Sequence, residues 1–326
     1  MFLKISSFFF MLILAFSSLF GIPLKCYETK ELFKDGDFEK GFTVMSQQTE
    51  NGVGIELGNF TFDETAEEPS WMIAQWNSGP CLWENNVSED KYTISDGLTK
   101  TVTYNPDEKS VSMRLNATNV YNSEPATYEN WPHLLLEQSP ICNYNELSET
   151  EKAFYNCSAD RIVLSLDIRL KDFVDTTNKD GVNAVQYLAY FYLKGTDNNK
   201  FIWFGADLFD NRGYNDTNWS LDKGSGQMIY CLSTKDTYGL KSKSLYRNGK
   251  PFVSDEWTHV EIDLTPHIAN AMRKANESDT FGQKVNAEDF YIGGTNIGFE
   301  VHGNYDCTVE IKNFKLTSYK KTGSII

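Results

Sequence analysis

Three short segments place ionisable and aromatic side chains where they could act together. In residues 131–138, strand alternation puts His133 and Glu137 on one face of an otherwise apolar stretch. A histidine near a carboxylate can carry out acid–base chemistry, because burial or proximity changes the pKa of both groups. The alternative is a hydrogen-bonded structural pair, since histidine and glutamate recur in structural networks as well.

A second segment suggests a surface for sugar rings. Trp203 and Asp207 share one face of a predicted strand whose other face is apolar. An indole can stack on a sugar, and a carboxylate accepts hydrogen bonds from its hydroxyl groups. Trp203 can equally pack between two sheets, as buried aromatic residues of a sandwich do. The further ligand-binding candidates are Trp131, Arg212 and Tyr214.

The third segment, residues 294–302, alternates regularly and predicts a half-buried strand with Glu300 and His302 on its polar face. If the three strands share a concave sheet, Glu137, Asp207 and Glu300 could supply the two carboxylates that a glycosidase needs. Strand order cannot be read from the sequence, so this joint placement is a hypothesis. The catalytic candidates are His133, Glu137, Glu300 and His302.

The elements that must position these residues are mostly strands. One helix is expected at 266–275, after a Thr265 N-cap, and a shorter one at 148–154, with a capping box. Alternation and turn residues predict strands at 41–45, 53–57, 71–76, 100–104, 111–116, 133–138, 161–170, 184–194, 200–209, 228–232, 259–264, 296–302 and 308–316. This pattern predicts an all-β, two-sheet antiparallel β-sandwich (jelly roll) with long loops and one or two short helices.

Two terminal segments carry a family resemblance. Residues 31–42 read ELFKDGDFEKGF, and residues 307–316 read CTVEIKNFKL. The first resembles the opening of β-jelly-roll carbohydrate-binding modules of the galactose-binding-like type, and the second loosely resembles their closing strand. The resemblance implies a jelly-roll fold and a structural calcium ion held by Asp37, Glu39 and Asn313. The alternatives are a plain Asp-Gly turn and a concanavalin-A-like sandwich.

The N-terminus predicts secretion. Lys4 precedes an apolar run at residues 8–16 and small residues after it, as in a signal peptide spanning 1–21. Residues 22–326 are then a single elaborated domain. No later run is long enough for a transmembrane anchor. The net charge of -15 argues against nucleic acid as a partner, because phosphates would repel the chain.

Six cysteines follow the predicted cleavage point, and an even number in a secreted chain predicts three disulfides. Only Cys142 with Cys157 is suggested by proximity. Seven Asn-X-Ser/Thr sequences predict N-glycosylation: Asn59, Asn86, Asn116, Asn156, Asn215, Asn218 and Asn276.

These observations predict a secreted glycoprotein that binds a polysaccharide or glycan on an aromatic and acidic sheet face. The chain lacks a Gly-x-Ser-x-Gly elbow, an HExxH pair and a Walker loop, which favours binding over catalysis. The enzyme alternative is a glycoside hydrolase or a polysaccharide lyase on the same scaffold. The third alternative is a structural or adhesive surface protein.

Overall fold

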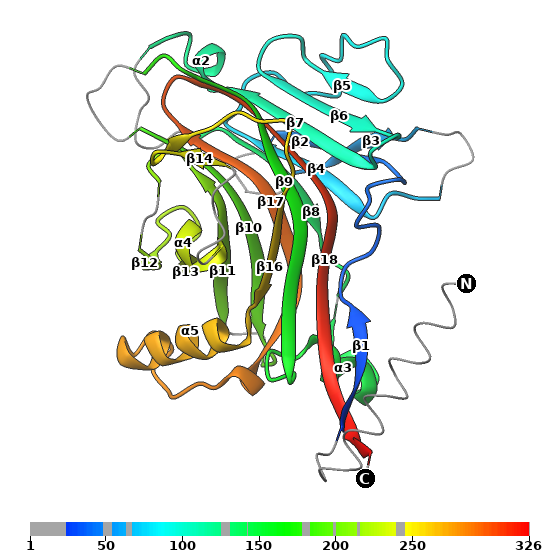
Figure 1. The fold of residues 1–326 in the computed structure, drawn as a ribbon, viewed down its shortest axis with the longest axis vertical. Helices are drawn as coiled ribbons and strands as arrows, with labels where there is room; N and C mark the ends of the chain where they lie inside the picture. Colours follow the sequence, from blue (N-terminus) through cyan, green and yellow to red (C-terminus); the bar gives the residue numbers. More distant parts are fainter. Residues whose placement is uncertain are drawn as a thin grey trace.

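The computed structural model describes these residues of the 326-residue chain: 24–47, 54–62, 67–124, 131–141, 143–177, 183–197, 200–213, 216–238 and 245–325. The predicted signal peptide, Cys142 and Tyr214 lie outside these ranges. The described chain forms two large sheets that pack face to face (Figure 1). The predicted all-β, two-sheet jelly-roll sandwich is therefore confirmed.

The seven-stranded sheet is organised around its longest strand, the C-terminal β18 (Figure 1). Its strands in spatial order are β16 (Thr258–Asp263), β9 (Arg161–Asp175), β18 (Tyr305–Ile325), β7 (Ser110–Asn116), β6 (Lys100–Asn105) and β5 (Thr93–Ser95), with β1 (Leu24–Glu31) paired to β18. The β1 partners on β18 are residues 317–325, so the two ends of the described chain form one antiparallel ribbon.

The nine-stranded sheet carries all three segments that the sequence singled out. Its strands in spatial order are β12 (Asn218–Leu221), β13 (Met228–Leu232), β11 (Phe201–Asp210), β10 (Ala184–Gly195), β17 (Phe290–His302), β8 (His133–Gln138), β4 (Trp71–Trp76), β2 (Phe42–Gln47) and β3 (Glu56–Phe60). The pairs β11–β13 and β2–β4 are parallel, unlike the predicted antiparallel order. After β11 the chain first forms β12, an edge strand, and then turns back to insert β13 between β12 and β11.

Side-chain alternation explains how the layers join. On β10, Tyr187, Ala189 and Phe191 are buried in the core between the sheets. The Tyr187 hydroxyl reaches across to Met113 of β7, with 3.2 Å between its oxygen and Sδ. Each large apolar side chain buried here contributes about 1.5–3 kcal/mol to folding. The intervening residues of β10, such as Tyr190, face away from the core.

Two of the helices match the sequence-based predictions. α3 (Glu149–Tyr155) begins after Ser148 with the predicted capping box to Glu151, and α5 (Thr265–Glu277) has proline in its first turn. The predicted Thr265 N-cap is wrong: Leu264 is the N-cap, and the Thr265 hydroxyl accepts the backbone N–H of Ile162 instead. Two short helices were not predicted: α2 (Ala117–Val120) and α4 (Thr234–Tyr238). Short 3-10 turns span Tyr144–Glu146 and Ala287–Asp289, and β14 (Tyr246–Arg247) pairs with β15 (Lys250–Pro251).

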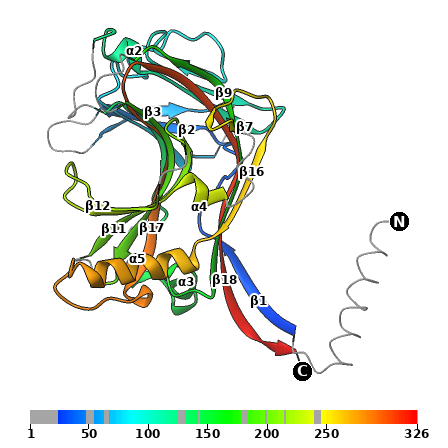
Figure 2. The same cartoon turned by 60° about the vertical axis from the view of Figure 1, so that its left-hand side comes forward.

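The nine-stranded sheet is strongly curved. Its long strands β10, β11 and β17 bend together, and the face turned away from the seven-stranded sheet is concave (Figure 2). We call this surface the concave face. Among the described residues, no helix is long and apolar enough to cross a membrane.

Candidate functional site

The concave face brings together side chains from β8, β17, β10 and β11. Strand register places Glu300 opposite both His133 and Gln186, and Asp207 opposite Leu188. Phe299 and Val301, on either side of Glu300, point into the core. The hypothesis that the three predicted segments share a concave sheet therefore agrees with the strand order.

A β-bulge adds a carboxylate that the sequence did not reveal. The register between β10 and β11 shifts at Tyr187/Leu188, so that Gln186 pairs with Asp210 while Leu188 pairs with Asp207. Both aspartates consequently line the concave face although they are three residues apart. Simple alternation would place residue 209 there, and no sequence signal marks the bulge. Bulges often re-aim side chains next to functional sites.

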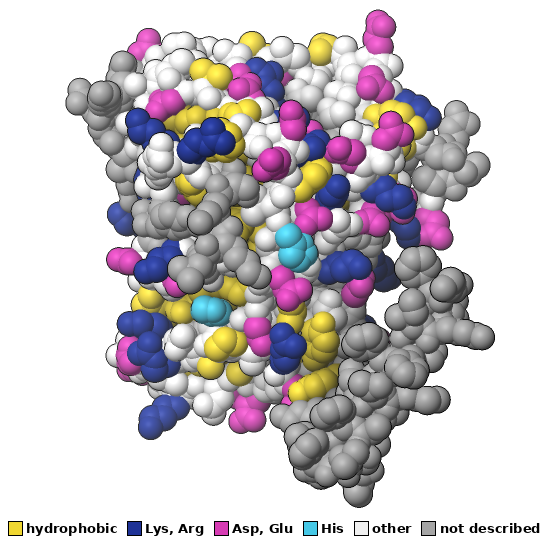
Figure 3. All heavy atoms as spheres, viewed as in Figure 1, with side chains coloured by type: hydrophobic (Ala, Val, Ile, Leu, Met, Phe, Trp, Pro, Cys, Tyr) yellow, Lys and Arg dark blue, Asp and Glu magenta, His cyan; other side chains and the backbone are white. Residues whose placement is uncertain are grey.

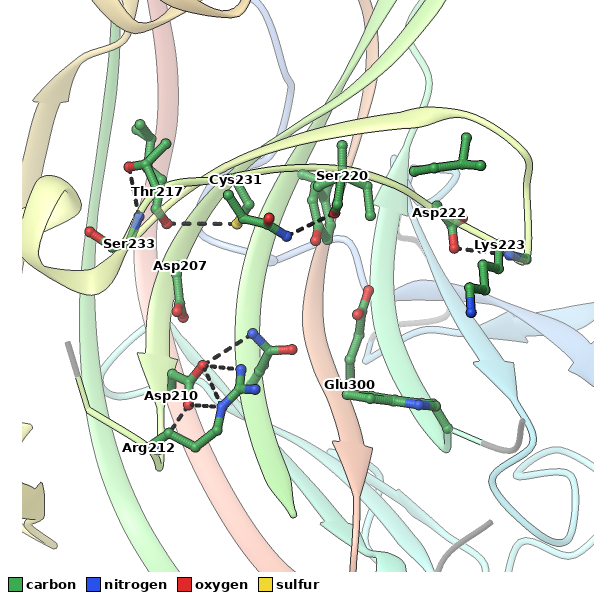
Figure 4. A pocket seen from close by; sticks show the side chains of 18 of the residues that line it. Asp207, Asp210, Arg212, Thr217, Ser220, Asp222, Lys223, Cys231, Ser233 and Glu300 are labelled. Carbon is green, nitrogen blue, oxygen red and sulfur yellow. Dashed lines mark hydrogen bonds and ion pairs between the residues drawn. The ribbon is translucent and has the colours of Figure 1, made fainter. Parts of the chain in front are cut away.

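A cavity of about 1090 Å³ opens on this face (Figure 4). Its floor comes from the curved sheet, and one wall comes from β12, β13 and the turn between them. The carboxylate residues that line it are Asp207, Asp210, Asp216, Asp222 and Glu300. Its other charged or aromatic lining residues are Trp131, His133, Tyr190, Arg212 and Lys223. The wall residues Asp216 and Asp222 were missed, because the sequence does not show where a loop folds back over a sheet.

Asp207 is the most unusual group of the cavity. Its side chain points into the cavity (Figure 4), yet it is only 3% exposed. Its Oδ1 has no hydrogen-bond partner within the described chain. Burial, followed by the negative charge of Asp210, raises the pKa of Asp207 well above its usual value. An unsatisfied buried carboxyl oxygen is destabilising, and such groups are common where a ligand binds.

Asp210 is satisfied by its neighbours. The Arg212 guanidinium donates to it from Nε at 2.9 Å and from Nη2 at 2.5 Å, and the Gln186 amide donates at 3.2 Å (Figure 4). The pair is bidentate, a geometry that favours arginine over lysine. Arg212 is thus used within the protein, and its charge is largely compensated by Asp210.

Glu300 lies at the centre of the cavity beside His133. Its Oε1 is 3.8 Å from His133 Nε2. Burial, with a contribution from Asp222, raises the pKa of Glu300 to about 7. Burial lowers the pKa of His133 to about 4, so this imidazole is neutral at pH 7. Glu300 can therefore exchange a proton near neutral pH without a cation next to it.

Glu137 faces the same side but belongs to a separate cluster. It accepts a hydrogen bond from the Tyr192 hydroxyl at 3.2 Å, and Asn296 lies opposite it on β17. Burial raises the pKa of Glu137. Neither Glu137 nor Tyr192 lines the cavity. His133 and Glu137, predicted as a pair, thus share a face, and the structure pairs them with Glu300 and Tyr192 instead.

The two tryptophans predicted to bind a ligand, Trp203 and Trp131, differ in whether they line the cavity. Trp203 is half-buried against Tyr192, with ring centroids 5.0 Å apart, and its indole N–H donates to Ser225 Oγ at 3.0 Å. Trp203 is not among the residues that line the cavity, whereas Trp131 is. The Trp131 ring lies 5.0 Å from that of His302, which is buried.

The three proposed calcium ligands do not share a contact, and their neighbours differ. Glu39 forms an ion pair with Lys109 at 2.7 Å, and the Asn313 amide donates to Asp167 at 2.6 Å. Asp37 lies in a turn, which Asp35 closes by accepting the backbone N–H of Glu39. The structure described here has no group of three or more His, Cys, Asp or Glu side chains suited to a metal. The turn alternative therefore describes these residues, and the calcium site stays a prediction.

The prediction of three disulfides is wrong. The five described cysteines are free, and they lie on separate elements: Cys26, Cys81, Cys157, Cys231 and Cys307. Their strand partners are not cysteines, because Cys231 pairs with Asn218 and Gly205 while Cys307 pairs with Leu115 and Phe173. Among the predicted glycosylation sites, Asn116 is buried and its side chain donates to Asp306.

Comparisons with known proteins give only distant likenesses. No protein-family model and no curated protein matches the chain. The endoglucanase Cel12A from Rhodothermus marinus has a TM-score of 0.37 and 10% identity, covering 73% of this chain and 90% of that one. A family 12 xyloglucanase from Bacillus licheniformis has a TM-score of 0.35 and 11% identity, covering 71% and 95%. The xyloglucanase domain of NopAA from Sinorhizobium fredii, in complex with cellobiose, has a TM-score of 0.33 and 10% identity, covering 71% of this chain and 99% of that one.

Likenesses this distant carry no inference about function. The sandwich itself confirms the β-jelly-roll part of the predicted resemblance. The galactose-binding-like type stays a prediction.

Proposed function

We propose that the cavity on the concave face binds a carbohydrate chain. One observation carries the proposal: a cavity of about 1090 Å³ combines aromatic rings with several carboxyl and amide groups. Rings of Trp131 and Tyr190 offer stacking surfaces, and Asp207, Gln186 and Asn77 offer hydrogen-bonding groups of the kind that sugar hydroxyls need. A few polar groups placed among aromatic surfaces are typical of ligand sites.

We further propose that the protein acts outside the cell as a secreted glycoprotein, with a polysaccharide or glycan as its partner. The predicted signal peptide at residues 1–21 and the exposed Asn59 and Asn86 sequences support this location. The module type suggested by residues 31–42, a galactose-binding-like jelly roll, belongs to the same proposal.

A glycan array followed by calorimetry on the best hit tests the binding proposal. Trp131→Ala should weaken binding by about tenfold or more, since it removes a stacking surface worth on the order of 1 kcal/mol or more. Trp83→Ala is the matched control, because Trp83 is exposed and lies outside the cavity lining. The proposal fails if no glycan binds, or if both variants bind as tightly as the wild type.

Hydrolysis of the bound chain is the second candidate, and the state of Glu300 favours it. A general acid needs a pKa near the working pH, and burial raises that of Glu300 to about 7. A second carboxylate is available in Asp207 or Asp222, each of which interacts electrostatically with Glu300.

Incubation with polysaccharides and measurement of new reducing ends tests hydrolysis. Glu300→Gln should abolish product while leaving binding in place, because the amide keeps the shape but cannot donate a proton. An unsaturated product that absorbs in the ultraviolet would indicate a lyase instead. If the wild type forms neither product, the protein is a binding protein.

A further inference from the structure

The charges of the cavity do not balance. Five carboxylate residues line it, against Arg212 and Lys223 as the only lysine or arginine side chains of the described lining. Asp210 already compensates Arg212 through two short hydrogen bonds. Lys223 is exposed, so water screens its charge. His133, the remaining basic group, is neutral at pH 7. The buried part of the cavity therefore contains acids without a matching cation.

Asp207 shows where that imbalance is greatest. Its Oδ1 is buried and lacks a hydrogen-bond partner in the described structure, and Asp210 stands three residues away on the same face. No metal-binding cluster occurs among the described residues, which argues against a divalent cation as the missing partner. A group that brings both positive charge and hydrogen-bond donors would satisfy this carboxyl group best.

Strand register places Asp207 and Glu300 close together on the concave face. Leu188 and Gly298 occupy the positions next to Asp207 in register, and Glu300 lies two residues beyond Gly298. Leu188 and Gly298 are both buried and do not line the cavity, so a ligand would contact the lining residues around them. The Tyr190 ring and the carboxyl groups of Asp207 and Glu300 line one cavity of about 1090 Å³, which can hold a flat ring with a polar substituent at its edge.

We propose that the carbohydrate bound in this cavity carries protonated amines, as in polymers of 2-amino sugars, and that Asp207 binds one ammonium group. This inference rests on the proposed carbohydrate-binding function and specifies its ligand class. The ammonium group donates to the Asp207 carboxylate, while Asp222 on the cavity wall provides a favourable negative charge. Polyuronates are disfavoured, because the lining offers their carboxylates no buried cation that is not already paired.

The proposal also specifies a proton balance. Burial and Asp210 favour the protonated form of Asp207 in the free protein. When an ammonium group binds, the carboxyl group releases its proton to solvent and the resulting carboxylate pairs with the ligand. Binding of an amino sugar therefore releases about one proton per site, and binding of a neutral sugar releases none.

Calorimetry on the full chain tests the proposal at about pH 6 and about 0.15 M salt. The probes are three β-1,4-linked oligosaccharides of equal length, made of glucosamine, N-acetylglucosamine and glucose. We expect the glucosamine oligomer to bind at least about tenfold more tightly than the other two. Titration in buffers of different ionisation enthalpy measures the proton release on the wild-type protein, so this test does not depend on a variant.

Asp207→Asn should remove the preference for the amine, because the isosteric amide cannot become an anion. Glu261→Gln is the matched control: it removes one charge from an exposed position of β16 and should retain the preference. Equal binding of glucosamine and glucose oligomers overturns the ligand class and leaves the carbohydrate-binding function in place. Absence of binding by all three overturns the ligand class, and the glycan array then decides whether the carbohydrate-binding function stands. If the Asp207→Asn variant still prefers the glucosamine oligomer, the preference comes from general attraction by an acidic protein. Asp207 is then not the ammonium-binding site.

Discussion

The outer face of the seven-stranded sheet and the concave face of the nine-stranded sheet handle charge in opposite ways. On the outer face, Arg169 forms ion pairs with Glu108 and Glu310 and lies over the Trp257 ring, with 4.1 Å to its centroid. Basic and acidic side chains intermingle over the surface shown in Figure 3. In the cavity, by contrast, Asp207 is buried and Glu300 is half-buried, and neither forms an ion pair with a lysine or arginine that the described structure shows.

This difference separates charges that stabilise the fold from charges kept for a ligand. A paired group such as Arg169 loses little free energy on burial, because hydrogen bonds to its partners replace those to water. Unpaired buried carboxyl groups lower stability and persist where function requires them. Substitutions in the two regions should therefore change stability in opposite directions.

The largest effect is expected from Arg169→Met. Arg169 is 8% exposed, and its removal would leave Glu310 and Glu108 without their cation. Breaking a buried pair from one side costs about 3–5 kcal/mol. Urea unfolding should show a loss of this size, and Lys171→Met, whose partner Asp255 is exposed, should lose far less. Equal losses in the two variants would contradict the comparison.

A smaller effect is expected from the pH dependence of Glu300. Its pKa is raised from 4.5 to about 7 in the folded protein, so the native state binds this proton more tightly than the unfolded chain. Its contribution to stability is complete below about pH 4.5 and is lost as the pH rises through about 7, a change of about 2–3 kcal/mol. Glu300→Gln should show a smaller decline in unfolding free energy between these pH values. Parallel curves for the two proteins would show that Glu300 titrates normally.

The smallest effect is expected from Asp207→Asn, and its sign is opposite to that of Arg169→Met. The amide keeps the side-chain volume and is neutral at any pH, whereas Asp207 must take up a proton at pH 7 to be buried as the neutral acid. The unfolding free energy should rise by about 1 kcal/mol at pH 7. A loss of stability would mean that Asp207 supports the fold, and the contrast between the two faces would then disappear.

The sequence predicted the parts of this site that depend on alternation alone. Trp203 and Asp207 share a face, and Glu300 lies opposite the core, because each strand turns successive side chains to opposite sides. Asp210 could not be predicted, since its position depends on a bulge in the pairing of β10 with β11. Asp222 could not be predicted either, because the wall of the cavity depends on how the turn after β12 folds over the sheet.

The same limits apply to the fold. Most strand positions followed from local pattern, and the helix α3 followed from its capping box. The strands β1, β5 and β12 were not predicted, and β3 lies at Glu56–Phe60 rather than at 53–57. The parallel insertion of β13 between β12 and β11 depends on contacts between distant segments, which a local pattern does not contain. The disulfide prediction rested on the even number of cysteines. That number does not show which cysteine side chains lie close together in the fold.

The central position of β18 also determines when the protein can fold. This strand comes last in the order of the described elements, yet β9, β7 and β1 all pair with it. Until β18 has been made, each of those three strands has an unpaired edge and an exposed apolar face. Pairings between segments so distant in sequence also form slowly. The seven-stranded sheet therefore closes only after β18 has been made, and the chain depends on protection from aggregation until then.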